Sequence, residues 1–302
     1  QTIPGLWECP DMFEMDAVDM QGKKTGKSYW VVNRGGVEYF IGTFDGKEFI
    51  PISANDPKNP YEFKRFQDTE YDQKRFLRRS VFKSGFYAAQ TFSNAPEGRI
   101  VQVSWMNDAK SAPNFPGCPW ENLLSFPAEV TLRDTGNGLV LEHTPVKEIQ
   151  SIYTQTHTRE NITLNEGVTD DLVPLTSNLL DIEVVFSTDH ARAFGLSILG
   201  EKIKYEPKKN RLDAFRYRDN ANNLKDAFAI IPPRDGKISL RILVDRSSIE
   251  LGVLNGLHRA GTFVYPQTDA QLKLEFFSEG GNAKIEKLAV HEIECEQASA
   301  NP

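Results

Sequence analysis

Short hydrophobic runs separated by turn residues repeat along almost the whole chain. The runs are rich in β-branched and aromatic residues, and Asn, Asp, Gly and Pro stand between them, which is typical of strands joined by tight turns. The turn signal at 33–36 lies between two such runs and predicts a hairpin. No long stretch has the periodicity of an amphipathic helix, so the pattern predicts an all-β protein. The runs are 29–32, 38–42, 86–92, 99–105, 128–132, 180–186, 192–199, 237–244, 248–253, 272–277 and 283–291.

A polar passage divides these runs into two sets. Hairpins crowded with aromatic residues precede the passage at 156–171, which is rich in Asn, Thr and Asp, and a fresh set of strands follows it. We therefore predict a first domain of residues 1–150, built from hairpin blades, and a β-sandwich domain of residues 151–302. Residues 61–79 are highly charged, and we expect a surface insertion there rather than a core helix.

Composition and charge narrow the possible partners. The 302 residues include 35 basic and 42 acidic side chains, for a net charge of −7. Nucleic acid and anionic membranes favour a basic face, so we expect neither as a partner, whereas a neutral sugar is compatible with this surface. The three cysteines, Cys9, Cys118 and Cys295, are too few and too uneven in number for a disulfide framework. No cysteine pair has zinc-site spacing and the five histidines are scattered, so we expect no metal and no cofactor.

The stretch Trp7-Glu8-Cys9-Pro10-Asp11 contains the clearest candidate for chemistry. Its glutamate lies between an indole and a thiol, and apolar surroundings disfavour a charged carboxylate. A carboxylic acid that keeps its proton near neutral pH is suited to general-acid catalysis. The alternative is that Glu8 is a strand residue whose carboxylate reaches solvent while Trp7 packs in the core. The residues alone leave both interpretations open.

The same stretch resembles the acid/base signature of glycoside hydrolase family 32, whose members cleave fructans and sucrose. Segments 39–49, 86–106, 124–133 and 240–251 are also similar to segments of that family and occur in the family order. The resemblance implies the later blades of a five-bladed β-propeller followed by a C-terminal β-sandwich. It also implies cleavage of β-fructosidic bonds with retention, with Glu8 as the catalytic residue that protonates the glycosidic oxygen.

The resemblance further implies that the neighbours of the glutamate contribute to substrate binding. Trp7, Cys9 and Asp11 flank it within the motif. The thiol of Cys9 is a polarisable neighbour of the acid in this interpretation, and a buried inert thiol is the alternative.

Three residues farther along the chain are additional candidates for substrate binding. Tyr87 and Gln90 are candidates to contact a sugar hydroxyl, with a core position for Tyr87 as the alternative, and the strand register decides between them. Trp120 lies on a loop before the predicted closing blade. Its indole either stacks on a sugar ring or fills the seam between the two domains.

A retaining glycosidase needs two carboxyl groups about 5–5.5 Å apart, one of them a nucleophile. In the family, an Asn-Asp-Pro-type motif supplies the nucleophile and an Arg-Asp-Pro motif supplies a stabilising aspartate, and both precede the acid/base motif. Only six residues precede Trp7, so we expect neither in its usual place and a chain incomplete for catalysis by itself. Asn55-Asp56-Pro57 follows Glu8 and is typical of an Asx turn, and Asp134 lies beside a Gly-Asn-Gly turn.

Two classes of function stay open. The first is a β-fructosidase-like hydrolase, for which we expect an extracellular or periplasmic location. The unpaired edge of a partial propeller then predicts association with a missing N-terminal segment or with another copy of the chain. The second class is a non-catalytic carbohydrate-binding relative, which the missing nucleophile favours and the intact motif at 7–11 opposes. A structural fragment without a ligand is the remaining alternative.

Overall fold

The computed structural model describes residues 7–35, 38–52, 78–83, 85–106, 122–169, 172–218, 224–264 and 273–294. Apart from the short 3-10 helices η2 (Pro96–Gly98), η3 (Lys147–Ile152) and η4 (Pro207–Lys209), the regular elements in these ranges are strands. The all-β prediction is therefore confirmed. None of the described helices has the length and apolar character needed to cross a bilayer. Residues 61–77 of the predicted surface insertion and the Asn55-Asp56-Pro57 turn lie outside the described residues. The end of the predicted insertion is wrong, because Arg78 and Arg79 form β5 and Arg78 is buried.

The first sheet has the strand order β4-β3-β2-β1-β10-β8-β7, with β11, β5 and β9 paired at its sides. In this sheet β1 runs parallel to β10. Strands β2 and β3 pair in antiparallel fashion, which confirms the hairpin predicted at 33–36. The strands are β1 (Asp11–Val18), β2 (Lys24–Asn33), β3 (Glu38–Phe44), β4 (Phe49–Pro51), β5 (Arg78–Arg79), β7 (Tyr87–Thr91), β8 (Ile100–Met106), β9 (Leu123–Leu124), β10 (Ala128–Asp134) and β11 (Leu139–Pro145).

Alternation along β1 explains how this sheet forms its core. Phe13, Met15 and Ala17 are buried, while the residues between them are exposed, which is the period of two expected for a half-buried strand. They pack with Val31 of β2 and Leu132 of β10 in one cluster of buried side chains. The first sheet therefore has a core cluster of its own, and Val140 of β11 packs into the cluster of the second half.

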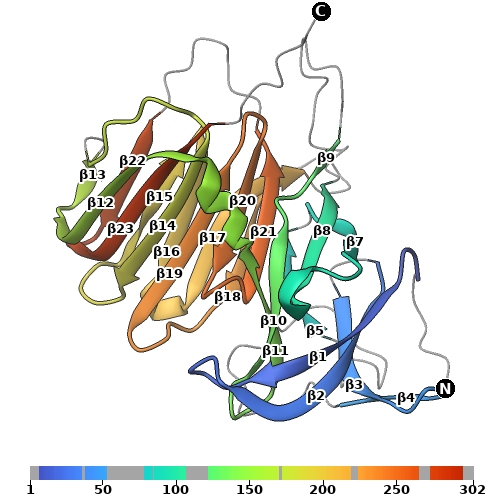
Figure 1. The fold of residues 1–302 in the computed structure, drawn as a ribbon. Helices are drawn as coiled ribbons and strands as arrows, with labels where there is room; N and C mark the ends of the chain where they lie inside the picture. The colour runs from blue at the N-terminus through green and yellow to red at the C-terminus, as the bar shows by residue number, and fades with distance from the viewer. Residues whose placement is uncertain are drawn as a thin grey trace, which may run out of the picture.

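The second half of the chain forms two sheets that pack face to face (Figure 1). Phe186 of β14 stacks on Phe194 of β15 across the interface, with ring centroids 4.9 Å apart, inside a large cluster of buried aliphatic side chains. The seven-stranded sheet contains β12 (Tyr153–Leu164), β23 (Ala283–Ile293), β14 (Leu180–Ser187), β19 (Lys237–Val244), β20 (Ser248–Val253), β21 (His258–Phe263) and β6 (Val81–Lys83), in that order. The six-stranded sheet contains β13 (Gly167–Thr169), β22 (Leu274–Glu279), β15 (Ala193–Ile198), β16 (Glu201–Glu206), β17 (Arg211–Arg218) and β18 (Leu224–Ile230).

One strand connects the two halves of the molecule. Strand β6 comes from the first half of the sequence, yet it pairs in parallel with β21 at the edge of the seven-stranded sheet, with Val81 opposite Arg259. The backbone N–H of Arg259 also donates a 2.7 Å hydrogen bond to the carbonyl of Ser80. The segment that leads into β7 is therefore attached directly to the second half.

Candidate functional site

The structure brings Glu8 and Tyr87 together, although 78 other residues separate them in the chain. Glu8 lies just before β1 and is exposed, and its carboxylate accepts a hydrogen bond from the Tyr87 hydroxyl. That hydrogen bond, with a smaller contribution from burial, raises the pKa of the Tyr87 phenol above its ordinary value. Glu8 is not part of a strand, so the interpretation of it as an exposed strand residue is wrong, although its carboxylate does reach the surface.

A β-bulge in β7 decides where Tyr87 and Gln90 lie. Ala88 has a φ of 47°, and the pairing of β7 with β8 shifts between Tyr87, opposite Trp105, and Gln90, opposite Val103. The extra residue lets both side chains reach the Trp7–Asp11 stretch. The Gln90 amide donates a 2.8 Å hydrogen bond to the carbonyl of Cys9. Tyr87 is half-buried rather than a core residue, so the core alternative for it is wrong.

Asp11, at the C-terminal end of the Trp7–Asp11 stretch, also attaches this stretch to β7. Its carboxylate oxygen Oδ2 accepts a 2.8 Å hydrogen bond from the backbone N–H of Thr91. Gln90 and Thr91 therefore tie to β7 the residues that follow Glu8, and the Tyr87 hydroxyl is the contact to the Glu8 side chain itself. Such ties hold a side chain in place, so that little entropy is lost when a ligand binds.

Trp7 is 40% exposed, so the alternative that places it in the core is wrong. Its ring stacks on Phe40 at 6.2 Å, and the Arg34 guanidinium lies 5.9 Å from the ring centroid, within cation–π range. Cys9 is exposed and forms no disulfide, which overturns the alternative of a buried thiol. An exposed indole is the kind of surface on which a sugar ring stacks.

Gly35 is a residue of the site that sequence reasoning treated only as part of a turn. It has a φ of +83°, and a Cβ built on it would lie 1.5 Å from the carbonyl oxygen of Glu8. Its own carbonyl accepts a 2.6 Å hydrogen bond from the N–H of Ala88. Glycine is therefore required here for two reasons, the left-handed backbone and the close approach of the motif. The signal in the sequence was the Gly-Gly pair, which marks a turn but not what packs on it.

Two other predicted positions have different outcomes. The Asp134 carboxylate accepts a 2.9 Å hydrogen bond from the N–H of Gly136, as expected for a turn residue. Trp120 lies outside the described residues, so its choice between sugar stacking and seam filling stays a prediction.

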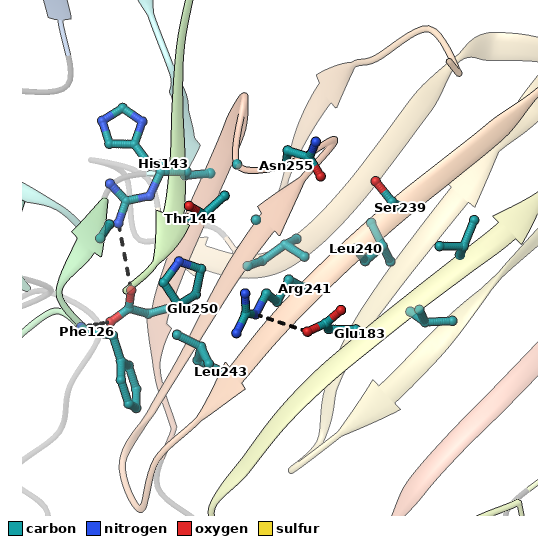
Figure 2. A pocket seen from close by; sticks show the side chains of 18 of the residues that line it. Phe126, His143, Thr144, Glu183, Ser239, Leu240, Arg241, Leu243, Glu250 and Asn255 are labelled. Atoms are coloured by element: carbon teal, nitrogen blue, oxygen red, sulfur yellow. Dashed lines mark hydrogen bonds and ion pairs between the residues drawn. The ribbon is translucent and has the colours of Figure 1, made fainter. Parts of the chain in front are cut away.

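A second polar region lies in a cavity of about 240 Å³ where β10 and β11 meet the outer face of the seven-stranded sheet (Figure 2). Glu250 is buried there, accepts a 2.7 Å hydrogen bond from the N–H of Phe126 and lies 3.8 Å from the Arg259 guanidinium. Burial raises the pKa of Glu250 to about 7 and lowers the pKa of Arg259. Burial also holds the pKa of His143, on the wall of this cavity, well below its ordinary value.

Sequence reasoning missed this group of charged residues. Glu250 lies between Ile249 and Leu251 in a strand that is buried on both faces, and both neighbours are also buried. An isolated acid within such an apolar run is a signal for a buried ion pair, because a buried charge needs a partner. Its partner, Arg259, lies on the neighbouring strand, which only the strand pairing identifies.

Comparisons with known proteins agree with one another over nearly the whole chain. The family model described as the glycosyl hydrolases family 32 N-terminal domain matches residues 1–143, and the one for the family 32 C terminal matches residues 148–292. A levanase from Bacillus subtilis is 27% identical, over 96% of this chain and 43% of its own length. An extracellular exo-inulinase from Aspergillus niger is 25% identical, over 96% of this chain and 55% of its own length.

One further relative and one solved structure also match this chain. A sucrose-6-phosphate hydrolase from Zymomonas mobilis is 26% identical, over 94% of this chain and 52% of its own length. The crystal structure of an exo-inulinase from Aspergillus awamori has a TM-score of 0.74 at 22% identity, and the match covers 95% of this chain and 57% of that one. This chain thus spans about half the length of the relatives it matches. The two family models and the relatives agree, and the chain belongs to glycosyl hydrolase family 32.

Proposed function

We propose that this chain is part of a hydrolase that cleaves β-fructosidic bonds in fructans or sucrose with retention, and that Glu8 is its proton donor. The observation that carries the proposal is the hydrogen bond from the Tyr87 hydroxyl to the exposed Glu8 carboxylate, next to residues that Gln90 and Thr91 tie to β7. The names of the levanase, exo-inulinase and sucrose-6-phosphate hydrolase relatives support the substrate class.

The chemistry assigned to Glu8 is transfer of its proton to the glycosidic oxygen as the bond to the fructosyl carbon breaks. The Tyr87 hydroxyl engages the oxygen Oε2, which leaves Oε1 for the glycosidic oxygen. Once the proton has left, the same hydroxyl stabilises the carboxylate by a charge-assisted hydrogen bond. The exposed indole of Trp7 is proposed to stack on a sugar ring beside the acid.

The second carboxyl group of a retaining mechanism is a separate question. It must lie about 5–5.5 Å from the acid/base carboxyl group. The expectations that this chain is incomplete for catalysis and that it associates with an N-terminal segment or another copy both stay predictions. Fructose release by the 302-residue chain alone, abolished in Glu8→Gln, would contradict the first of them.

The proposed fold and location are supported by the same relatives. We propose that residues 1–150 are later blades of a five-bladed β-propeller and that residues 151–302 are the family's β-sandwich. The likeness to the Aspergillus awamori exo-inulinase supports this division, and so do the face-to-face sheets of the second half. We propose an extracellular location because the Aspergillus niger relative is named an extracellular enzyme.

A non-catalytic carbohydrate-binding protein is the second candidate, because the exposed Trp7 offers a stacking surface whether or not a bond is broken. Fructose release from levan, inulin and sucrose distinguishes the two candidates, measured with this chain in its full encoded polypeptide. The proposal expects release that Glu8→Gln abolishes and that Glu14→Gln, at an exposed acid on β1, leaves intact. Oligosaccharide binding without any release would support the second candidate instead.

A further inference from the structure

Gly85 and Phe86, the two residues just before β7, rest on the backbone of β21 in the second half of the molecule. Gly85 packs so closely that a Cβ built on it would lie 2.7 Å from the carbonyl oxygen of Gly261. Together with the pairing of β6 and β21, this contact leaves the segment no room to shift toward the seven-stranded sheet. The position at which β7 begins is therefore set by β21.

Phe86, the residue just before β7, is held from the same side. Its side chain is only 3% exposed, and the Arg259 guanidinium lies 4.1 Å from the centroid of its ring. A Cβ on Gly261 would lie 3.1 Å from two atoms of this ring, so the ring packs directly against the β21 backbone. Cation–π contact and close packing therefore both fix Phe86 in one position.

Arg259 is itself held by Glu250, whose carboxylate lies 3.8 Å away. Glu250 also accepts the hydrogen bond from the N–H of Phe126, so it connects the sandwich to the segment before β10 as well. Both charges are buried, and a buried pair is costly to break because the remaining charge has no compensation. Figure 2 shows Glu250 directed toward Phe126 at the edge of the cavity.

Phe86 immediately precedes Tyr87, and consecutive side chains in an extended segment point to opposite sides. Fixing Phe86 against β21 therefore directs Tyr87 away from the sandwich, toward Glu8. The Tyr87 ring also lies edge-on to Trp105, at 6.2 Å, which limits its rotation. These contacts form a continuous series that leads from Glu250 through Arg259, Phe86 and Tyr87 to the Glu8 carboxylate.

We propose that Arg259 and Glu250, in the sandwich, are positioning residues that hold the Tyr87 hydroxyl on the Glu8 carboxylate. Neither residue is assigned contact with the substrate. The catalytic meaning of this coupling rests on the proposed function, but the coupling itself is a property of the chain and is measurable without substrate.

The test is the titration of Tyr87, followed by NMR of protein labelled with ¹³C at the tyrosine ζ carbon. The Tyr87 signal is assigned by its loss in Tyr87→Phe. The wild-type phenol is expected to titrate above the ordinary value of about 10, and Glu8→Gln is expected to bring it back toward that value. Arg259→Met is expected to have the same effect as Glu8→Gln, and Arg259→Lys to retain most of the wild-type shift.

Arg192→Met is the matched control, because Arg192 also pairs with a glutamate of the sandwich, at 3.6 Å, but is 71% exposed. It is expected to leave the Tyr87 titration unchanged. Where Arg259→Met fails to fold, Phe86→Leu provides the second test, since it removes the aromatic ring without leaving a buried charge unpaired. An unchanged Tyr87 titration in a folded Arg259→Met protein, or in Phe86→Leu, overturns the proposal. Unimpaired fructose release by Glu8→Gln would overturn the proposed function and leave this coupling intact.

Discussion

Two carboxyl groups of this protein, Glu8 and Glu250, illustrate opposite solutions to holding an acid in place. Glu8 is exposed, lies outside any strand and is held by a single tyrosine hydroxyl. Glu250 is 7% exposed, lies in the middle of β20, and is held by a backbone N–H and a buried guanidinium. The first arrangement leaves the carboxyl accessible to a ligand, whereas the second uses the carboxyl to fasten two parts of the molecule.

The comparison also shows that neighbours along the chain are poor guides to the surroundings of a side chain. Trp7 and Cys9 flank Glu8 in sequence, yet all three are exposed. Ile249 and Leu251 flank Glu250 in the same way, and there the carboxyl is enclosed and its pKa rises to about 7. Burial depends on what packs against the residue from distant parts of the chain, which adjacent residues do not specify.

Replacing each glutamate by glutamine is expected to give the largest difference between the two sites, in activity and in thermal stability. Glu8→Gln should lower kcat/KM for fructan or sucrose by about 100- to 10,000-fold, because it removes the proposed general acid. Its thermal unfolding midpoint should stay at the wild-type value, since the side chain is exposed. Glu250→Gln should instead raise the midpoint relative to wild type as the pH increases from 5 to 8, because the neutral amide avoids burying an ionised carboxylate. A midpoint difference between Glu250→Gln and wild type that does not change with pH would contradict this contrast.

The pH dependence of stability sharpens the description of Glu250. Its pKa is about 7 in the folded state, against an ordinary value of 4.5, so between these pH values the folded state binds more protons than the unfolded state. Its contribution to stability is therefore fully present below about pH 4.5 and is lost as the pH rises to about 7.

The measurement is the free energy of unfolding by urea at several pH values between 5 and 8. Compared with wild type, Glu250→Gln should lack a decrease on the order of 1 kcal/mol per pH unit below pH 7. His258, whose pKa burial lowers to about 4, and His143, whose pKa burial also lowers, contribute the opposite slope below their unfolded pKa of about 6.5 in both proteins. The difference between the two proteins therefore isolates Glu250, and parallel profiles would show that its carboxyl does not titrate in this range.

A smaller effect on kcat/KM is expected when the Glu8 carboxylate loses the hydrogen bond that Tyr87 donates. Tyr87→Phe removes the hydroxyl that donates to Glu8 but keeps the ring against Trp105. A hydrogen bond to a charged group contributes about 1.5–3 kcal/mol, so kcat/KM should fall by roughly 10- to 150-fold. Tyr29→Phe, a tyrosine on β2, is the control. A Tyr87→Phe enzyme with wild-type kcat/KM would mean that the hydrogen bond does not contribute to catalysis.

The smallest effect is expected on oligosaccharide affinity, from a change beside the exposed indole of Trp7. Arg34→Met removes the guanidinium 5.9 Å from the Trp7 ring, which is 40% exposed, and a cation–π contact on an exposed ring contributes about 0.5–1 kcal/mol. Arg34 itself is 13% exposed and also pairs with Glu38, at 3.4 Å. Oligosaccharide affinity should therefore change by less than about tenfold, while the tryptophan emission spectrum shifts. Arg246→Met, at an exposed arginine of the sandwich, should leave both unchanged. A tenfold or larger loss of affinity would instead indicate that Arg34 contacts the ligand.

Strands with a dense hydrophobic run could be predicted from the sequence because their signal is local. The runs at 29–32 and 38–42 lie in β2 and β3, and the Asn-Arg-Gly-Gly turn between them predicts their hairpin. In contrast, β1 was not among the predicted runs, and most of the predicted polar passage at 156–171 belongs to strand β12. The Trp7–Asp11 motif likewise identified the family, because the order of short similar segments survives in the sequence itself. These features depend on neighbouring residues and on the period of two of an extended backbone.

The arrangement around Glu8 depended on the tertiary structure. The bulge at Ala88 decides which residues of β7 face the motif, and no local pattern marks it. The parallel pairing of β6 with β21 joins segments more than 150 residues apart in the sequence. Glu250 is buried against Arg259, which lies on a different strand. Residue types and their spacing determined the family and the strands of this protein. Register and long-range packing decided which side chains meet, because those depend on how the sheets are assembled.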